Sequence, residues 1–350
     1  MTDAAVEDMI RSTAEKLFAE APPPMEACGE ACVFDRHLWS RASEVGFPAA
    51  LADEAQGGLG LTAAQAFAAI RVAAARAVSL PLGETVLVNW LLGLAGLPIE
   101  AGPCGINLPS DKATGEAVPY GRALCLVIVV EPTGQGATFA LYRPQAADWT
   151  PGVNIADEPR DVLSAVPEVF EATGVLPVSP DTVLAAMAML RAVQAAAATA
   201  SVLEMCLAYC NQREQFGRPL SKFQAIQHQL ARLAGESSAA TMAADMALRA
   251  FGQVIARPDD FRITAAAAKI RTAQAATQAA AIAHQVHGAI GFSGEYALHP
   301  LTRRLWSWRD EYGSEAYWAE CLGREMAARD PAEFWPYLTS LDTVEEGRSA

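Results

Sequence analysis

Apolar residues recur at three- and four-residue spacing in both the first and the last parts of the chain, a pattern typical of amphipathic helices. The pattern runs through residues 5–20 and 37–51 and extends to about Leu97. Thr62 stands where an N-cap would begin another helix that continues to Val78. Residues 1–100 are therefore predicted to form an N-terminal α-helical domain.

The glycine-rich break Gly57-Gly58-Leu59-Gly60 interrupts this helical part. One interpretation is a loop that cradles a phosphate, and the other is a helix C-cap followed by a turn. No Lys or Ser/Thr follows at the spacing of a P-loop, so the pattern favours the cap and turn.

The pattern changes between about Pro98 and Pro180, where prolines and glycines become frequent. Short runs with strand character occupy residues 123–130, 138–144 and 161–166. Residues 101–180 are predicted to form a small β-domain with few strands. The segment from Glu131 to Gly136 is predicted to be a hairpin loop.

From Asp181 onward the pattern is helical again and rich in alanine. Three long stretches cover residues 182–213, 222–256 and 260–287. Their small side chains and lack of internal proline favour closely packed antiparallel helices. Residues 181–350 are therefore assigned to a C-terminal helical bundle.

Composition narrows the class of protein. Of 350 residues 52% are hydrophobic, which argues against disorder. The net charge of −14 makes nucleic acid and anionic membranes poor partners. The apolar run of residues 85–99 contains Asn89 and is shorter than the about 20 residues that cross a bilayer. The acidic N-terminus does not resemble a signal peptide, so a cytoplasmic location is expected.

No metal site is expected from the cysteines and histidines. The number of cysteines, seven, is odd, and reduced thiols are the expectation. No carboxylate stands at ligand spacing from the histidines of the C-terminal half, which favours ordinary packing roles. These histidines are His228, His284, His287 and His299.

Two segments of the C-terminal part carry candidate chemistry. The first is Arg213-x-x-Phe216-Gly217 followed by residues 223–227, FQAIQ, and the second is Gln285-x-x-Gly288-x-x-Gly291-Phe292. Each places a helix end beside a glycine-bearing turn with an arginine nearby, which can hold a phosphorylated cofactor. Each segment alone is also typical of a simple cap and turn.

Together with residues 38–60, LWSRASEVGFPAALADEAQGGLG, these segments resemble the signatures of the acyl-CoA dehydrogenase family, in the same order. The resemblance implies an α+β, mainly α fold with an N-terminal helical domain, a small, here reduced, β-domain and a four-helix bundle. It also implies FAD-dependent α,β-dehydrogenation of an acyl-CoA substrate, with an electron-transfer flavoprotein as a possible partner.

The resemblance assigns a set of cofactor contacts to this chain. In the family, the C-terminal domain of one subunit contacts the ADP part of a flavin whose ring a neighbouring subunit holds. The matching positions are Arg213, Phe216, Gln224, Gln285 and Gly288.

The catalytic base of the family has no counterpart at the matching positions. The carboxylate that usually precedes a Gly-Thr or Gly-Ser step is replaced by Tyr312. The alternative base position on the first long helix of the bundle falls at or near Met187. Neither side chain is an ionised base near neutral pH.

Glu311 is a weak candidate for the base because it lies one residue away, about 100° around a helix end. The competing interpretation is a carboxylate that is solvated or ion-paired with Arg303, Arg304 or Arg309. The flavin-ring motif of the family, an acidic-Pro-Gly-Ala-Gly-Ser-like turn, has no good counterpart here, and the Trp-Ile-(Ser/Thr)-Asn contact is missing.

The chain therefore resembles the smaller subunits of heteromeric α2β2 acyl-CoA dehydrogenases of bacterial steroid side-chain degradation. The resemblance implies a larger partner subunit that supplies the catalytic Glu and the flavin-ring pocket. Two alternatives stay open: a self-sufficient dehydrogenase that uses Glu311, and a scaffold subunit without flavin or substrate.

Overall fold

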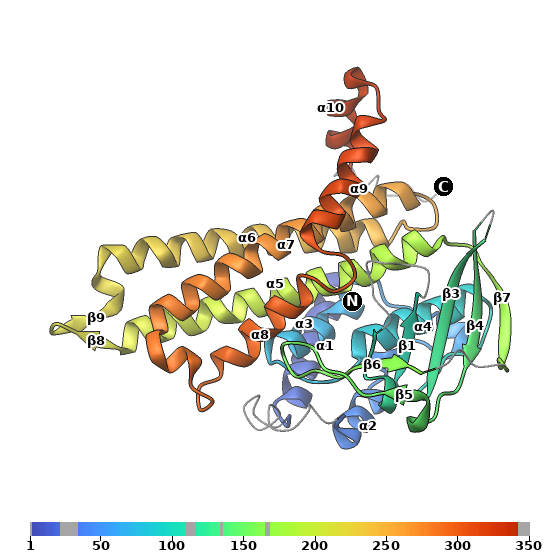
Figure 1. The fold of residues 1–350 in the computed structure, drawn as a ribbon, viewed down its shortest axis with the longest axis horizontal. Helices are drawn as coiled ribbons and strands as arrows, with labels where there is room; N and C mark the ends of the chain where they lie inside the picture. Colours follow the sequence, from blue (N-terminus) through green and yellow to red (C-terminus); the bar gives the residue numbers. More distant parts are fainter. Residues whose placement is uncertain (1, 22–33, 109–116, 134–135, 165–168, 342–350) are drawn as a thin grey trace.

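The computed structural model describes residues 2–21, 34–108, 117–133, 136–164 and 169–341. A helical part comes first along the chain, a part with small sheets follows, and long helices come last (Figure 1). This order confirms the expected mainly α fold.

Helices and short 3-10 turns make up the first hundred residues. They are α1 (Asp3–Phe18), α2 (Arg36–Glu44), η1 (Phe47–Ala49), η2 (Glu54–Gln56), α3 (Ala63–Ala75) and α4 (Leu82–Leu94). Thr62 caps α3 as predicted. Its hydroxyl accepts from the backbone N–H of Gln65, and the side-chain oxygen of Gln65 accepts from the backbone N–H of Thr62.

The glycine-rich break is a turn, as the pattern favoured. Gly57 ends η2 with a φ of +87°, a conformation that glycine adopts without steric cost. Gly58 lies against the Ala52 carbonyl, and a Cβ built on Gly58 would stand 2.0 Å from that oxygen. The break is therefore shaped by close backbone packing.

The middle of the chain forms two small sheets beside the helices. The first sheet has the order β1-β3-β4-β7, with β1 and β3 parallel and the other pairs antiparallel. The second has the order β2-β6-β5 and is antiparallel. The elements of this part are β1 (Cys104–Asn107), β2 (Ala117–Pro119), η3 (Gly121–Ala123), β3 (Leu126–Thr133), β4 (Gly136–Tyr142), η4 (Ala146–Asp148), β5 (Trp149–Thr150), β6 (Arg160–Leu163) and β7 (Ala172–Leu176).

The three predicted strand runs correspond to β3, β4 and β6, with shifted ends. The run expected from residue 123 begins later because residues 121–123 form a 3-10 turn. A hairpin is present where a loop from Glu131 to Gly136 was predicted, but residues 131–133 and Gly136 belong to the paired strands β3 and β4. The two residues between them lie outside the described part. Strands β1, β2, β5 and β7 were not predicted, because they have two to five residues and no clear alternation.

Three long helices dominate the last part of the chain. Helix α5 (Pro180–Gln212) and helix α7 (Pro258–His287) run in the same direction, with α6 (Gln224–Phe251) antiparallel to both (Figure 1). Fully buried alanines on α5 and α7, such as Ala198 and Ala279, belong to one apolar cluster and allow these helices to approach closely. The remaining elements are β8 (Glu214–Gln215), β9 (Arg218–Pro219), η5 (Leu220–Lys222), η6 (Gly288–Phe292), α8 (Leu298–Trp308), α9 (Glu315–Ala327) and α10 (Pro331–Ser340).

Helix α5 is long and apolar enough to pass a test for a membrane span, among the described residues the one helix that does. Its most apolar window is 89% buried inside the protein, as expected for the core helix of a bundle.

Replacing Gly58 with alanine should destabilise the fold. We expect Gly58→Ala to lower the free energy of unfolding by about 1–3 kcal/mol, because the new methyl group would overlap the Ala52 carbonyl. Gly235→Ala is the matched control on α6, where an added Cβ meets no atom within 4 Å, and should raise stability by about 0.5–1 kcal/mol. Urea denaturation measures both values, and equal effects of the two substitutions would contradict the packing described here.

Candidate functional site

All five positions expected to contact a cofactor lie at one end of the helical bundle. Arg213 follows α5 directly, and Gln285 stands in the last turn of α7. These two helix ends touch, because the Tyr209 hydroxyl donates to the His287 carbonyl at 3.4 Å and their rings stack at 4.4 Å. Two sequence segments some seventy residues apart are thus brought to one surface.

A short hairpin, β8–β9, forms the tip of this end. Phe216 sits at its turn with a φ of +52° and is 93% exposed. The guanidinium of Arg218 lies 4.2 Å from the centroid of the Phe223 ring, which holds the hairpin against the start of α6. Phe223, the N-cap of α6, has no side-chain oxygen to cap the helix, so backbone N–H groups at Gln224 and beyond are available to an anion.

The end of α7 offers an open surface beside this hairpin. Gln285 and Gly288 are both exposed. Gly288 has φ +62° and ψ −141°, a conformation that glycine alone adopts readily, and a Cβ there would meet no atom within 4 Å. The glycine is therefore required by the turn, and it leaves space for a group that approaches from outside.

These residues fit the diphosphate and ribose part of a dinucleotide. The exposed Arg213 guanidinium supplies a planar fork for phosphate oxygens, the uncapped start of α6 supplies N–H donors, and Phe216 supplies an unburied aromatic face. Metal ligands are not gathered anywhere in the described part, where no group of three or more His, Cys, Asp or Glu could hold an ion.

The two base positions lie far from this surface, in the interior. Met187 is fully buried in α5 within the main apolar core. Tyr312 follows α8 with a φ of +54°, is 6% exposed, and its hydroxyl has no hydrogen-bond partner among the described residues. Burial raises the pKa of Tyr312, so its hydroxyl stays protonated and cannot act as a base.

The interior next to these positions is filled by paired charges. Arg191, one turn along α5 from Met187, lies 5.1 Å from the centroid of the Tyr312 ring. Its Nη2 donates to Glu84 Oε1 at 2.8 Å and its Nε to Glu311 Oε2 at 2.7 Å. A buried guanidinium in contact with two carboxylates is fully compensated.

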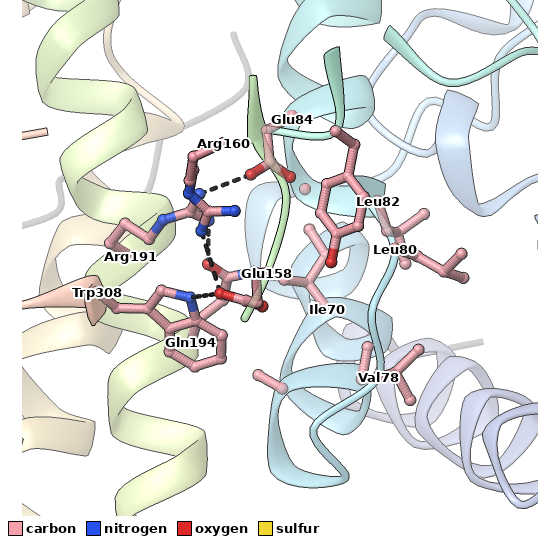
Figure 2. Close-up of a pocket in the computed structure, with 14 residues that line it drawn as sticks. Ile70, Val78, Leu80, Leu82, Glu84, Glu158, Arg160, Arg191, Gln194 and Trp308 are labelled. Carbon is pink, nitrogen blue, oxygen red and sulfur yellow. Dashed lines mark hydrogen bonds and ion pairs between the residues drawn. The ribbon is translucent and has the colours of Figure 1, made fainter. Parts of the chain in front are cut away.

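A second arginine extends this network towards the small sheets. Arg160 of β6 donates from Nε to Glu311 Oε1 at 2.9 Å, and from Nη2 to Glu158 Oε2 at 3.1 Å. Glu158 also accepts from Arg304 Nε and from Trp308 Nε1, each at 3.1 Å. Figure 2 shows Arg160 and Arg191 side by side next to Glu84, with Glu158 bound to Trp308 below them. We refer to Glu84, Glu158, Arg160, Arg191, Arg304 and Glu311 as the ionic network.

The structure corrects which arginines pair with Glu311. Glu311 is ion-paired, but with Arg160 and Arg191 instead of Arg303, Arg304 or Arg309. The three nearby arginines form ion pairs with Asp157, Glu158 and Asp310 respectively. Closeness in the sequence therefore did not predict the partners of Glu311, which come from distant segments.

The ionic network also explains why Glu311 is unsuited to remove a proton. Burial opposes ionisation of this carboxyl group, but Arg160 and Arg191 outweigh burial and lower its pKa to about 2. A carboxylate with so low a pKa is a weak base near neutral pH.

The turn that carries Glu311 and Tyr312 is held in place by a buried lysine. Lys269 of α7 is 1% exposed and donates from Nζ to the Trp308 and Arg309 carbonyls at 2.6 and 2.7 Å. Burial lowers the pKa of Lys269 to about 7. Two carbonyls at the end of α8 thus gain a donor that the helix itself cannot supply.

A cavity of about 20 Å³ adjoins the ionic network, which is room for roughly one water molecule. Apolar residues of α3 and of the segment leading into α4 line one side, among them Ile70, Val78 and Leu80 (Figure 2). Glu84, Glu158, Arg160 and Arg191 line the other side. An acyl chain cannot enter a space of this size without displacing side chains.

Sequence reasoning missed the partners that define this interior. Glu84 and Arg191 each stand in an otherwise apolar helical run, and an isolated charge in such a run was the available signal. Arg160 begins the short strand β6 and Glu158 precedes it, and neither stands in an apolar run that would make its charge conspicuous.

Removing the charge of Glu311 should destabilise the protein in a pH-dependent way. The folded-state pKa lies below the unfolded value, so the unfolded chain binds more protons at acidic pH and this contribution to stability is lost as pH falls from about 4.5 towards 2. Glu311→Gln leaves two buried guanidinium groups undercompensated and should lower the free energy of unfolding at pH 7 by about 3–5 kcal/mol.

Urea denaturation between pH 7 and pH 3 measures this effect. The variant should show a flatter decline than the unmodified protein. Glu320→Gln is the control, since its ion pair with Arg324 lies on the exposed surface of α9 and is expected to matter little. Equal losses from both substitutions would show that the network does not stabilise the fold.

Comparison with known proteins gives the family. The family model "Acyl-CoA dehydrogenase, N-terminal domain" matches residues 5–98, and "Acyl-CoA dehydrogenase, C-terminal domain" matches residues 180–326. The chain is 27% identical over 347 residues to acyl-CoA dehydrogenase IpdE2 of Mycobacterium tuberculosis, covering 96% of this chain and 99% of that protein.

Solved structures share the fold over nearly the whole chain. Butyryl-CoA dehydrogenase from Megasphaera elsdenii superimposes with a TM-score of 0.77 at 18% identity, covering 93% of this chain and 99% of that one. A chain of the ChsE4-ChsE5 complex from Mycobacterium tuberculosis gives a TM-score of 0.76 at 19% identity, covering 93% and 98%. With both of its end parts matched, the chain belongs to the acyl-CoA dehydrogenase family of FAD-dependent flavoproteins.

Proposed function

We propose that this chain is the subunit of a heteromeric acyl-CoA dehydrogenase that binds the ADP side of a shared FAD, while a larger partner subunit supplies the catalytic Glu and the flavin-ring pocket. The proposal is supported above all by the two base positions, which hold Met187 and Tyr312, while the neighbouring Glu311 is bound by Arg160 and Arg191. The surface that fits a dinucleotide is open, and the interior around the base positions is closed.

The length of helix α5 gives the distance between the two sites. Met187 lies near its start and Arg213 directly after its end, so about 39 Å of helix separates them at 1.5 Å per residue. One FAD molecule is too short to reach from Arg213 to a ring beside Met187. A dinucleotide held at Arg213 would therefore place its ring outside this chain, in a neighbouring subunit.

The filled interior also supports a catalytic site in the partner subunit. The ionic network and the core occupy the space beside Met187 and Tyr312, and the adjoining cavity holds about one water molecule. Glu311 is bound by two arginines, which argues against the alternative of a self-sufficient enzyme that uses Glu311 as its base.

Each residue of the open surface has a role in the proposed complex. FAD, when bound, accepts the hydride that leaves the β-carbon of the acyl-CoA. Arg213 would pair with the diphosphate, and the start of α6 at Gln224 would donate N–H groups to it. Phe216 would be buried against the cofactor or the partner, and Gln285 and Gly288 would line the other side.

The relatives suggest the kind of complex and substrate. Among the solved structures with this fold are the ChsE4-ChsE5 complex and a structure described as "Tcur3481-Tcur3483 steroid ACAD G363A variant", the latter at 20% identity and a TM-score of 0.77. We infer an α2β2 heterotetramer in the cytoplasm that acts on an acyl-CoA, with a steroid side-chain CoA as the first substrate to test. An electron-transfer flavoprotein is the proposed electron acceptor.

Loss of Arg213 should weaken flavin binding by the assembled complex. We expect Arg213→Ala, co-expressed with the larger subunit, to raise the dissociation constant for FAD by about 10–150-fold, because a charge-assisted hydrogen bond is worth about 1.5–3 kcal/mol. Arg11→Ala is the matched control, since Arg11 is an exposed arginine on α1 that pairs only with the exposed Asp8. Flavin absorbance and fluorescence titration of the purified complexes measure the effect.

Three outcomes separate the proposal from its alternatives. One flavin per heterodimer, weakened by Arg213→Ala alone, supports the shared site. Unchanged flavin content in the Arg213→Ala complex favours a scaffold subunit. A yellow, active protein from this chain purified alone favours the self-sufficient enzyme.

A further inference from the structure

Two cysteines lie side by side at the start of the first sheet. Cys104 is the first residue of β1, and Cys125 directly precedes β3. The two strands are parallel with Cys104 opposite Leu126, and the Cys125 amide donates to the Pro103 carbonyl at 2.8 Å. Residues offset by one position on neighbouring strands have Cα atoms about 6 Å apart, within the range of about 4.4–6.8 Å that a disulfide spans.

The two sulfur atoms converge on one glycine. The Cys104 thiol donates to the Gly102 carbonyl at 3.3 Å. A Cβ built on Gly102 would stand 2.4 Å from Cys125 Sγ, so this sulfur occupies the space that a side chain would fill. Gly102 thus admits both thiols to one small volume.

The two thiols differ in exposure and in acidity. Cys104 is fully buried, and burial raises its pKa. Cys125 is half-buried, and its interaction with the Cys104 side chain lowers its pKa, with Arg143 favouring the thiolate and burial and Glu100 opposing it. A half-buried thiol with a lowered pKa beside a fully buried thiol is the arrangement of an attacking cysteine with a resolving cysteine.

We propose that Cys104 and Cys125 form a dithiol site that hydroperoxides oxidise to a disulfide. The Cys125 thiolate attacks one peroxide oxygen, the O–O bond breaks, and Cys125 becomes a sulfenic acid while water leaves after protonation. Cys104 then attacks the Cys125 sulfur, the S–S bond forms, and the sulfenic oxygen leaves as a second water. The two thiols lose two electrons in total, and hydrogen peroxide is reduced to two waters.

A second cysteine pair in the same chain provides an internal control. Cys206 and Cys210 lie one turn apart on α5, and both are fully buried. Burial raises the pKa of Cys206 to about 12. This pair lacks an accessible thiolate and should stay reduced.

The experiment treats the full-length protein with hydrogen peroxide at pH 7, blocks free thiols with an alkylating reagent, and maps cysteine peptides by mass spectrometry. We expect a peptide pair joined through Cys104 and Cys125, formed at least about tenfold faster than any loss of Cys206 or Cys210 thiol, because Cys125 is more exposed and burial raises the pKa of both helix thiols. The dithiol is a property of this chain alone, so the result does not depend on the partner subunit.

Two variants assign the roles of the cysteines. Cys104→Ser should let dimedone trap a sulfenic acid on Cys125, and Cys125→Ser should leave Cys104 reduced under the same treatment. Circular dichroism checks that each variant is folded. Oxidation of Cys104 to the same extent in Cys125→Ser and in the unmodified protein, or a Cys125 that reacts no faster than Cys206, would overturn the proposal.

Discussion

The structure depends on balancing the positive charge of Arg191, which is buried inside the protein. A guanidinium that is 2% exposed requires opposite charge within contact distance, since an unpaired buried charge costs several kcal/mol. Its partners, Glu84 and Glu311, come from α4 and from the turn after α8. This requirement ties the first helical part, the bundle and, through Arg160, the small sheets into one interior.

The same interaction has a functional consequence. Family members that carry out the dehydrogenation need an open space with a free carboxylate next to the flavin ring. Here the corresponding interior holds a carboxylate that two arginines bind, a tyrosine kept neutral by burial and a methionine in the core. In the described part of this chain, paired charges and core side chains fill the space beside Met187 and Tyr312.

Helix α5 connects the filled interior to the exposed end of the bundle. Its beginning supplies Met187 and Arg191 to the closed interior, and its end leads into Arg213 and the exposed hairpin. The small side chains that let α5 and α7 pack closely also bring Tyr209 and His287 together, which places the segments after Arg213 and around Gly288 side by side. One long helix thus separates an exposed surface around Arg213 from a filled interior around Met187.

The sequence by itself determined the features that depend on local patterns. Apolar periodicity predicted the long helices, and Thr62 predicted the start of α3. The motifs around Arg213 and Gly288 predicted a cofactor surface, and the fold brings both motifs to one end of the bundle. The sequence did not reveal β1, β2, β5 and β7, because such short strands are formed by pairing more than by their own residues. The partners of Glu311 and the meeting of Cys104 with Cys125 were decided only by the tertiary structure, because contacts between distant segments depend on how the helices and strands pack.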